Sequence, residues 1–100
     1  MKKIVNKTKN WNNKNTDDLC DAILMLKNKD ELKNLLRDLL TPNEIVEFGN
    51  RLKSAKMLKN GVHYNAIAEA TGLSSRTIAR VQHWLKKGMG GYRKVLSKSH

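Results

Sequence analysis

The stretch that decides the fold is YNAIAEATGLSSRTIARVQHWL, residues 64–85. It predicts a short helix, a tight turn at Gly72 and a second helix that Ser74 caps. The apolar positions of the second helix recur at i, i+3 and i+7 and therefore share one face; they are Ile78, Val81 and Leu85. Two short helices joined by a glycine turn are typical of a helix-turn-helix.

The outward face of the second helix is polar and basic. An arginine in the first turn of such a helix can bond both acceptors of a guanine, so Arg76 is the first candidate for base readout, with a phosphate contact as the alternative. Tyr64 and Asn65 begin the first helix, where the DNA backbone would lie, and are candidates for phosphate contacts. The other residues that we expect at the DNA are Ser75, Thr77, Ala79, Arg80 and His83.

The charge of the chain is far from neutral and unevenly distributed. The net charge is +11, made up of +5 in residues 1–16, −4 in residues 17–50 and +10 in residues 51–100. Such a balance favours a polyanionic partner, either nucleic acid or an anionic membrane. No predicted helix combines a basic face with an exposed bulky apolar face, so the pattern favours DNA and no membrane.

Further helices are expected on both sides of the motif. Thr16 is the predicted N-cap of a helix that ends near Lys27, and a second helix covers about 29–40. The sequence TPNE at 41–44 is a capping box with proline at the first helical position, and it starts a helix that runs to Asn60. A last helix is expected from about 89 to 96.

These elements predict an all-α fold of about six helices with no strand. We expect one domain at 16–98, preceded by a flexible basic arm at 1–15. Five leucines fall within nine residues, 32–40, which is too many for a lone surface helix to bury. Part of this stripe is therefore expected to contact another chain, and Trp84 is expected in the core or at the same contact.

The sequence lacks the residue patterns of several classes of protein. Cys20 is the one cysteine, so no intrachain disulfide is possible, and its apolar neighbours suggest a core thiol. His63, His83 and His100 stand apart, without the spacing of a metal site. No glycine-rich phosphate loop or nucleophile motif is present, so we expect neither an enzyme nor a bound cofactor. No apolar run approaches the ~20 residues of a membrane span, and a cytoplasmic location is expected.

The order of these motifs resembles the trp repressor family over about residues 16–98. The resemblance is carried by LTPNE at 40–44, GNR at 49–51 and the helix-turn-helix at 64–85. The longer segment RLKSAKMLKNGVHYNAIAEATGLSSRTIARV is similar to the YerC/YecD-type branch. The resemblance implies an intertwined homodimer that binds double-stranded DNA at a palindromic operator, with recognition helices one DNA turn apart.

The same resemblance implies a small-molecule pocket. In trp repressor two arginines sandwich the indole ring of tryptophan, and these match Arg51 and Arg80, while Thr41 matches the threonine that lines the pocket. Val81 departs from the pattern, because the family has glycine there. A branched side chain in the space of the ring would cost about 1–3 kcal/mol. We therefore expect that tryptophan is not bound, and that the two arginines contact phosphates or pair with acids across the dimer.

The function predicted from the sequence is a sequence-specific, DNA-binding transcriptional regulator, a repressor, that acts as a dimer. Two alternatives stay open. One is an architectural or replication-linked DNA-binding or assembly module, which would occupy DNA broadly instead of at a few symmetric sites. The other is a tryptophan-responsive repressor.

Overall fold

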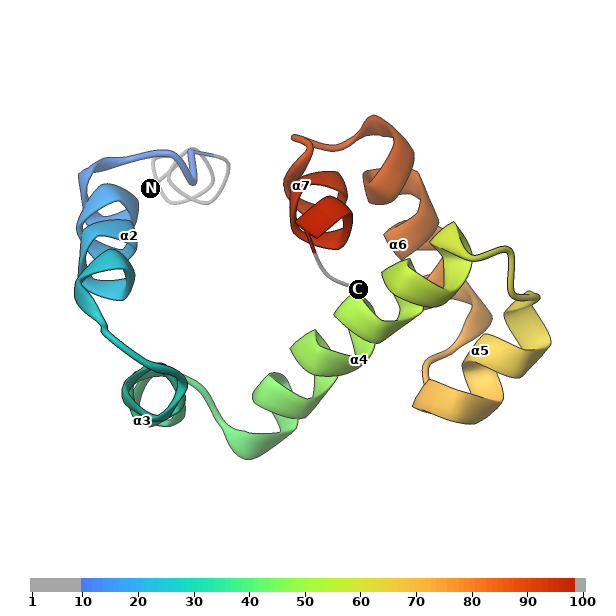
Figure 1. Cartoon of the computed structure of the whole chain (residues 1–100), viewed down its shortest axis with the longest axis horizontal. Helices are drawn as coiled ribbons and strands as arrows, with labels where there is room; N and C mark the ends of the chain where they lie inside the picture. The colour runs from blue at the N-terminus through green and yellow to red at the C-terminus, as the bar shows by residue number, and fades with distance from the viewer. Residues whose placement is uncertain (1–9, 99–100) are drawn as a thin grey trace, which may run out of the picture. The chain divides into compact units, whose positions relative to one another are not determined.

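The computed structural model describes residues 10–98 of the chain. In this range all regular structure is helical, which confirms the all-α class (Figure 1). The helices are α2 (Lys14–Met25), α3 (Lys29–Leu39), α4 (Pro42–Lys59), α5 (Tyr64–Thr71), α6 (Ser75–Lys87) and α7 (Gly91–Lys98). Two compact units divide the chain, Met1–Leu40 and Thr41–His100.

The first unit contains α2 and α3. The N-cap of α2 is Asn13, whose side chain accepts a hydrogen bond from the amide of Thr16 at 3.0 Å, so the prediction that Thr16 is the cap was wrong. Both residue types cap helices well, and the apolar stripe does not distinguish between them. Lys14 is therefore helical although it was expected in the arm, whose residues 1–9 lie outside the described range.

Neither helix of the first unit buries a residue within this single chain. Cys20 is exposed, so the prediction of a core thiol was wrong for the chain alone. Leu24 on the same helix is 82% exposed. Within the described residues, the apolar side chains of α2 are therefore at most partly covered.

In the second unit, α4 begins with the predicted capping box. Thr41 Oγ1 accepts from the amide of Glu44 at 3.1 Å, and the Glu44 carboxylate accepts from the amide of Thr41 at 2.8 Å. Pro42 occupies the first turn, as expected for a residue with fixed φ and no N–H. The helix ends at Lys59 and is followed by Gly61 with a φ of +79°.

The core of this unit lies where α5, α6 and α7 pack against α4 (Figure 1). One cluster consists of the buried residues Ala55, Val81 and Leu96, against which Leu58, Leu85 and Tyr92 pack. Ile67 of α5 and Ile78 of α6 are also fully buried. Two apolar residues of α4 stay partly exposed in this chain, Phe48 at 52% and Leu52 at 41%. The buried residues of α4 are Ser54 and Ala55, so the other helices cover its C-terminal half.

Two glycines of this unit lie within α4 and just before α7. Gly49 inside α4 faces open space, because outside its own helix backbone no atom of the described residues would lie within 4 Å of an added Cβ. The last helix begins at Gly91 instead of near Met89, because Gly90 has a φ of +88° and interrupts the helical backbone.

Candidate nucleic-acid interface

The turn between α5 and α6 is fixed by one glycine and one threonine. Gly72 adopts a φ of +74° and donates its amide to the carbonyl of Ala68 at 2.7 Å. The hydroxyl of Thr71, a residue only 8% exposed, donates to the carbonyl of Ile67 at 2.8 Å and accepts from the amide of Leu73 at 3.2 Å. Thr71 thus joins the last turn of α5 to the loop, a role that the sequence pattern did not reveal.

The start of α6 is held by Ser74. Its hydroxyl accepts from the amide of Thr77 at 3.2 Å, which confirms the predicted N-cap. The same hydroxyl donates to the side-chain oxygen of Thr77 at 3.1 Å. Thr77 is half-buried. One of the residues expected at the DNA is therefore engaged in the cap of its own helix.

The two faces of α6 differ as the periodicity predicted. Ile78 is 0% and Val81 3% exposed, whereas the outward residues Ser75, Arg76, Ala79, Arg80 and His83 are exposed. Within residues 10–98 the ion pairs are Lys14–Asp18 and Arg51–Glu47, and neither involves α6. The two arginines of the outward face are thus free of carboxylate partners in the described part of the chain.

The first helix of the motif is tied to the second by a tyrosine. The hydroxyl of Tyr64, which is half-buried, donates to the side-chain oxygen of Gln82 on α6. Asn65 is exposed. His63 makes no side-chain hydrogen bond as the N-cap of α5, so the first amide groups of this helix lack a side-chain cap. The sequence did not reveal the role of Gln82, because apolar periodicity identifies the buried face of a helix and not the hydrogen-bond partners of its polar residues on another helix.

Two residues of the expected effector pocket, Thr41 and Arg51, lie far apart along α4. Thr41 precedes Arg51 by ten residues of α4, which corresponds to about 15 Å along the axis. Arg51 pairs with Glu47 of the same helix at 2.5 Å, and its Nε is buried without a partner. Arg80 is exposed on α6. A small pocket that contains both Thr41 and Arg51 would need the threonine of another chain.

Val81 lies in the core. It is 3% exposed and packs with Ala55 of α4 and Leu96 of α7. Both methyl groups of Val81 are thus enclosed by side chains of the same unit. At this position, where trp repressor has glycine, the valine of this chain is a core residue.

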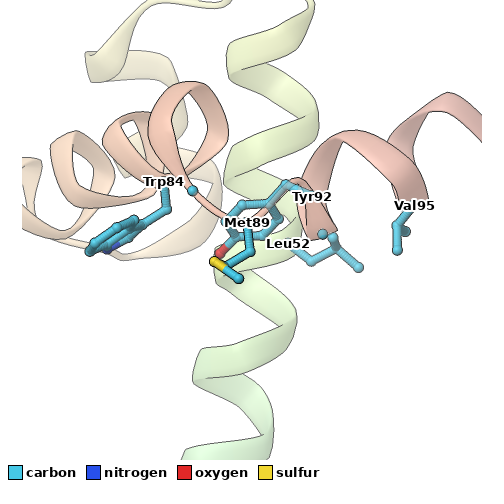
Figure 2. A pocket seen from close by; sticks show the side chains of 7 residues that line it. Leu52, Trp84, Met89, Tyr92 and Val95 are labelled. Atoms are coloured by element: carbon cyan, nitrogen blue, oxygen red, sulfur yellow. The ribbon is translucent and has the colours of Figure 1, made fainter. Parts of the chain in front are cut away.

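An apolar cavity of about 510 Å³ lies beside the end of α6 (Figure 2). Trp84 at its edge is 52% exposed, so the prediction of a core position was wrong for the chain alone, whereas a dimer contact stays a prediction. The Trp84 ring also meets that of His83 edge-on, with centroids 4.7 Å apart. The cavity is lined by Leu52, Trp84, Gly88, Met89, Gly91, Tyr92 and Val95.

The described residues contain neither a metal-binding cluster nor a membrane-spanning helix. No group of three or more His, Cys, Asp or Glu side chains gathers there in a way that could hold a metal ion. No helix in that range combines the length and apolar character that crossing a membrane requires.

Comparison with known proteins agrees with the helix-turn-helix geometry. The family model described as Trp repressor protein matches residues 14–100. The chain belongs to the Trp repressor family. It falls in the YerC-type branch, since it is 39% identical over 85 residues to the uncharacterized protein YerC of Bacillus subtilis, covering 85% of this chain and 82% of YerC.

Solved structures of the Trp repressor family superpose closely on this chain. A TrpR-like protein from Eubacterium eligens has a TM-score of 0.86 at 38% identity, over 90% of this chain and 93% of the other. A proposed Trp repressor from Staphylococcus aureus has a TM-score of 0.84 at 38% identity, over 90% of both chains. The family and the structural neighbours indicate a helix-turn-helix DNA-binding regulator.

Proposed function

We propose that this protein is a sequence-specific transcriptional regulator, a repressor, that binds a palindromic operator as a dimer. The observation that carries the proposal is the exposed polar and basic face of α6, held in place by the Ser74 cap and the α5–α6 turn. The unit that presents it has eleven basic and three acidic residues between positions 41 and 100. A basic surface of this kind supplies the sequence-independent part of DNA binding.

The contacts of α6 follow from the chemistry of its side chains. Arg76 in the first turn is assigned to a guanine, because its forked donors match the two acceptors of that base in the major groove. Ala79 can pack against a thymine methyl group, and Ser75 and Thr77 can bond base edges or phosphates. Arg80 and His83, further along the same face, are assigned to the DNA as well.

The backbone contacts are assigned to the start of α5. The exposed side chain of Asn65 and the amide groups there, which lack a side-chain cap, are donors that suit a phosphate. Tyr64 is assigned to the same phosphate through its backbone amide, because its one hydroxyl proton is donated to Gln82. Its bond to Gln82 keeps the ring at the α5–α6 crossing.

A dimer is supported by the apolar surface of the single chain. The helices α2 and α3 bury no residue, although α3 alone carries four leucines. In the other unit Phe48 is 52% and Met89 89% exposed. Apolar surface of this extent is typical of association, and a small chain gains a sufficient core in that way. An intertwined two-fold dimer, as in trp repressor, would cover the apolar residues of α2 and α3 as well as Phe48 and Met89. It would also present two α6 helices to a symmetric DNA site.

We propose further that the regulator acts without tryptophan, because Val81 occupies a packed position in the core. We assign Arg51 a structural role, because its guanidinium pairs with Glu47 of its own helix in the single chain. The cytoplasmic location is part of the proposal, because the protein must meet chromosomal DNA.

The test is to select fragments of the host genome that the full chain binds and to sequence them. A repressor of this type yields a small set of sites with dyad symmetry and half-sites about one helical turn apart. An architectural module yields broad occupancy with weak preference. That second result would contradict the proposed function and support the alternative.

A further inference from the structure

A second cavity, of about 520 Å³, lies between the ends of α4 and α6 and one side of α7. It shares no lining residue with the apolar cavity or with the residues assigned to DNA. Its volume is within the range of small-molecule sites. The lining consists of Lys59, Leu85, Lys86, Arg93 and Ser97.

Three of these side chains are cations that come from three different helices. Lys59 ends α4, Lys86 lies in the last turn of α6, and Arg93 lies on α7. No carboxylate lines the cavity. Cations that line the same cavity repel one another, and a bound anion would offset this repulsion by its attraction to each of them.

The acids of the same unit are placed elsewhere. Glu44 belongs to the capping box of α4, and Glu47 pairs with Arg51. Glu69 lies on α5, which contributes no residue to the cavity. The three cations therefore have no carboxylate of their own unit to neutralise them in the described structure.

The donors of the cavity are partly positioned. Lys59 Nζ donates to the carbonyl of Leu96 at 3.3 Å, which holds the ammonium group against α7 and leaves two of its three protons for a ligand. Arg93 adds a forked set of donors that suits the geometry of a phosphate. Leu85, partly buried at the core, gives the cavity an apolar wall.

We propose that this cavity binds an oxyanion of the phosphate class. The phosphate can belong to a free phosphorylated small molecule or to the DNA backbone, and the chemistry of recognition is the same. Because Lys86 is part of α6, an occupant would be attached to the helix that carries Arg76, ten residues or about 15 Å away along the axis. Binding of the free anion does not depend on the proposed function.

The first experiment titrates the full-length, isotope-labelled chain with inorganic phosphate, against sodium chloride at equal ionic strength, and follows backbone amide NMR signals. Saturable shifts are expected at the lining residues of α6 and α7. Lys86→Gln and Arg93→Gln should each weaken phosphate binding about tenfold, as expected for the loss of a charged hydrogen bond. The controls Lys87→Gln and Lys94→Gln remove the same charge from adjacent positions that do not line the cavity.

The second experiment identifies the source of the phosphate by measuring DNA binding at several salt concentrations. If a backbone phosphate occupies the cavity, Lys86→Gln and Arg93→Gln each reduce the slope of log affinity against log salt by about 1, whereas both controls leave it unchanged. If the occupant is a free anion, the slopes stay equal and only the phosphate titration responds. The proposal is overturned if the two variants match their neighbouring controls in both experiments.

Discussion

Replacing Val81 by Ala tests the core on which the account of this chain depends. Val81 is 3% exposed and packs with Ala55 and Leu96. The substitution removes two methyl groups, worth about 1.6 kcal/mol of transfer free energy at about 0.8 kcal/mol each. A residual cavity raises the loss to about 2–3 kcal/mol, and the higher helix propensity of alanine returns about 0.5 kcal/mol. The expected net loss of unfolding free energy is about 2 kcal/mol.

The assay is thermal and urea unfolding of both proteins at the same protein concentration, because the stability of a dimer depends on concentration. For a chain of this size the loss corresponds to a fall in the melting temperature of roughly 8–16 °C. The matched control is Val46→Ala, which makes the same change within helix α4 at a position that is 61% exposed. If the two variants lost equal stability, Val81 would not have the core role assigned to it.

Three further predictions use the turn, the end of α6 and the effector. Thr71→Val should lower the unfolding free energy by about 1–2 kcal/mol, because the amide of Leu73 loses its acceptor. Thr71→Ser should retain this hydrogen bond, and equal losses of stability in the two variants would refute the role of the hydroxyl. Gly88→Ala should cost about 1–3 kcal/mol in urea unfolding, because the new methyl would overlap the backbone carbonyl of Trp84, whereas Gly91→Ala, with open space, should not. Calorimetry with tryptophan should show no tight binding, and a micromolar affinity would show that a pocket exists despite Val81.

The parts of the structure that the sequence predicted well are local. The α5–α6 motif depends on Gly72, on the Ser74 cap and on apolar residues within one helix, and all of these act over a few positions. The capping box at Thr41 is equally local. The incorrect cap of α2 shows the limit, because Asn13 and Thr16 are both suitable and only the backbone geometry decides.

The parts that could not be predicted depend on which surfaces meet. An apolar stripe shows that Cys20 or Phe48 needs cover, but not whether its own chain or another provides it. The bond from Tyr64 to Gln82 joins residues 18 positions apart and has no sequence signal. Likewise, the lysines and the arginine of the second cavity come from three helices and converge only in the folded unit.

The most direct test of the central claim is to measure how Arg76→Ala changes selectivity between the selected operator and variants altered at single base pairs. Loss of a guanine contact should reduce discrimination at one position of each half-site by about 1–3 kcal/mol and leave the other positions unaffected. Lys53→Ala, a basic residue of α4 outside the reading face, is the control and should weaken all sequences alike. Unchanged selectivity in Arg76→Ala would contradict the assignment of α6 as the helix that reads the DNA through this residue.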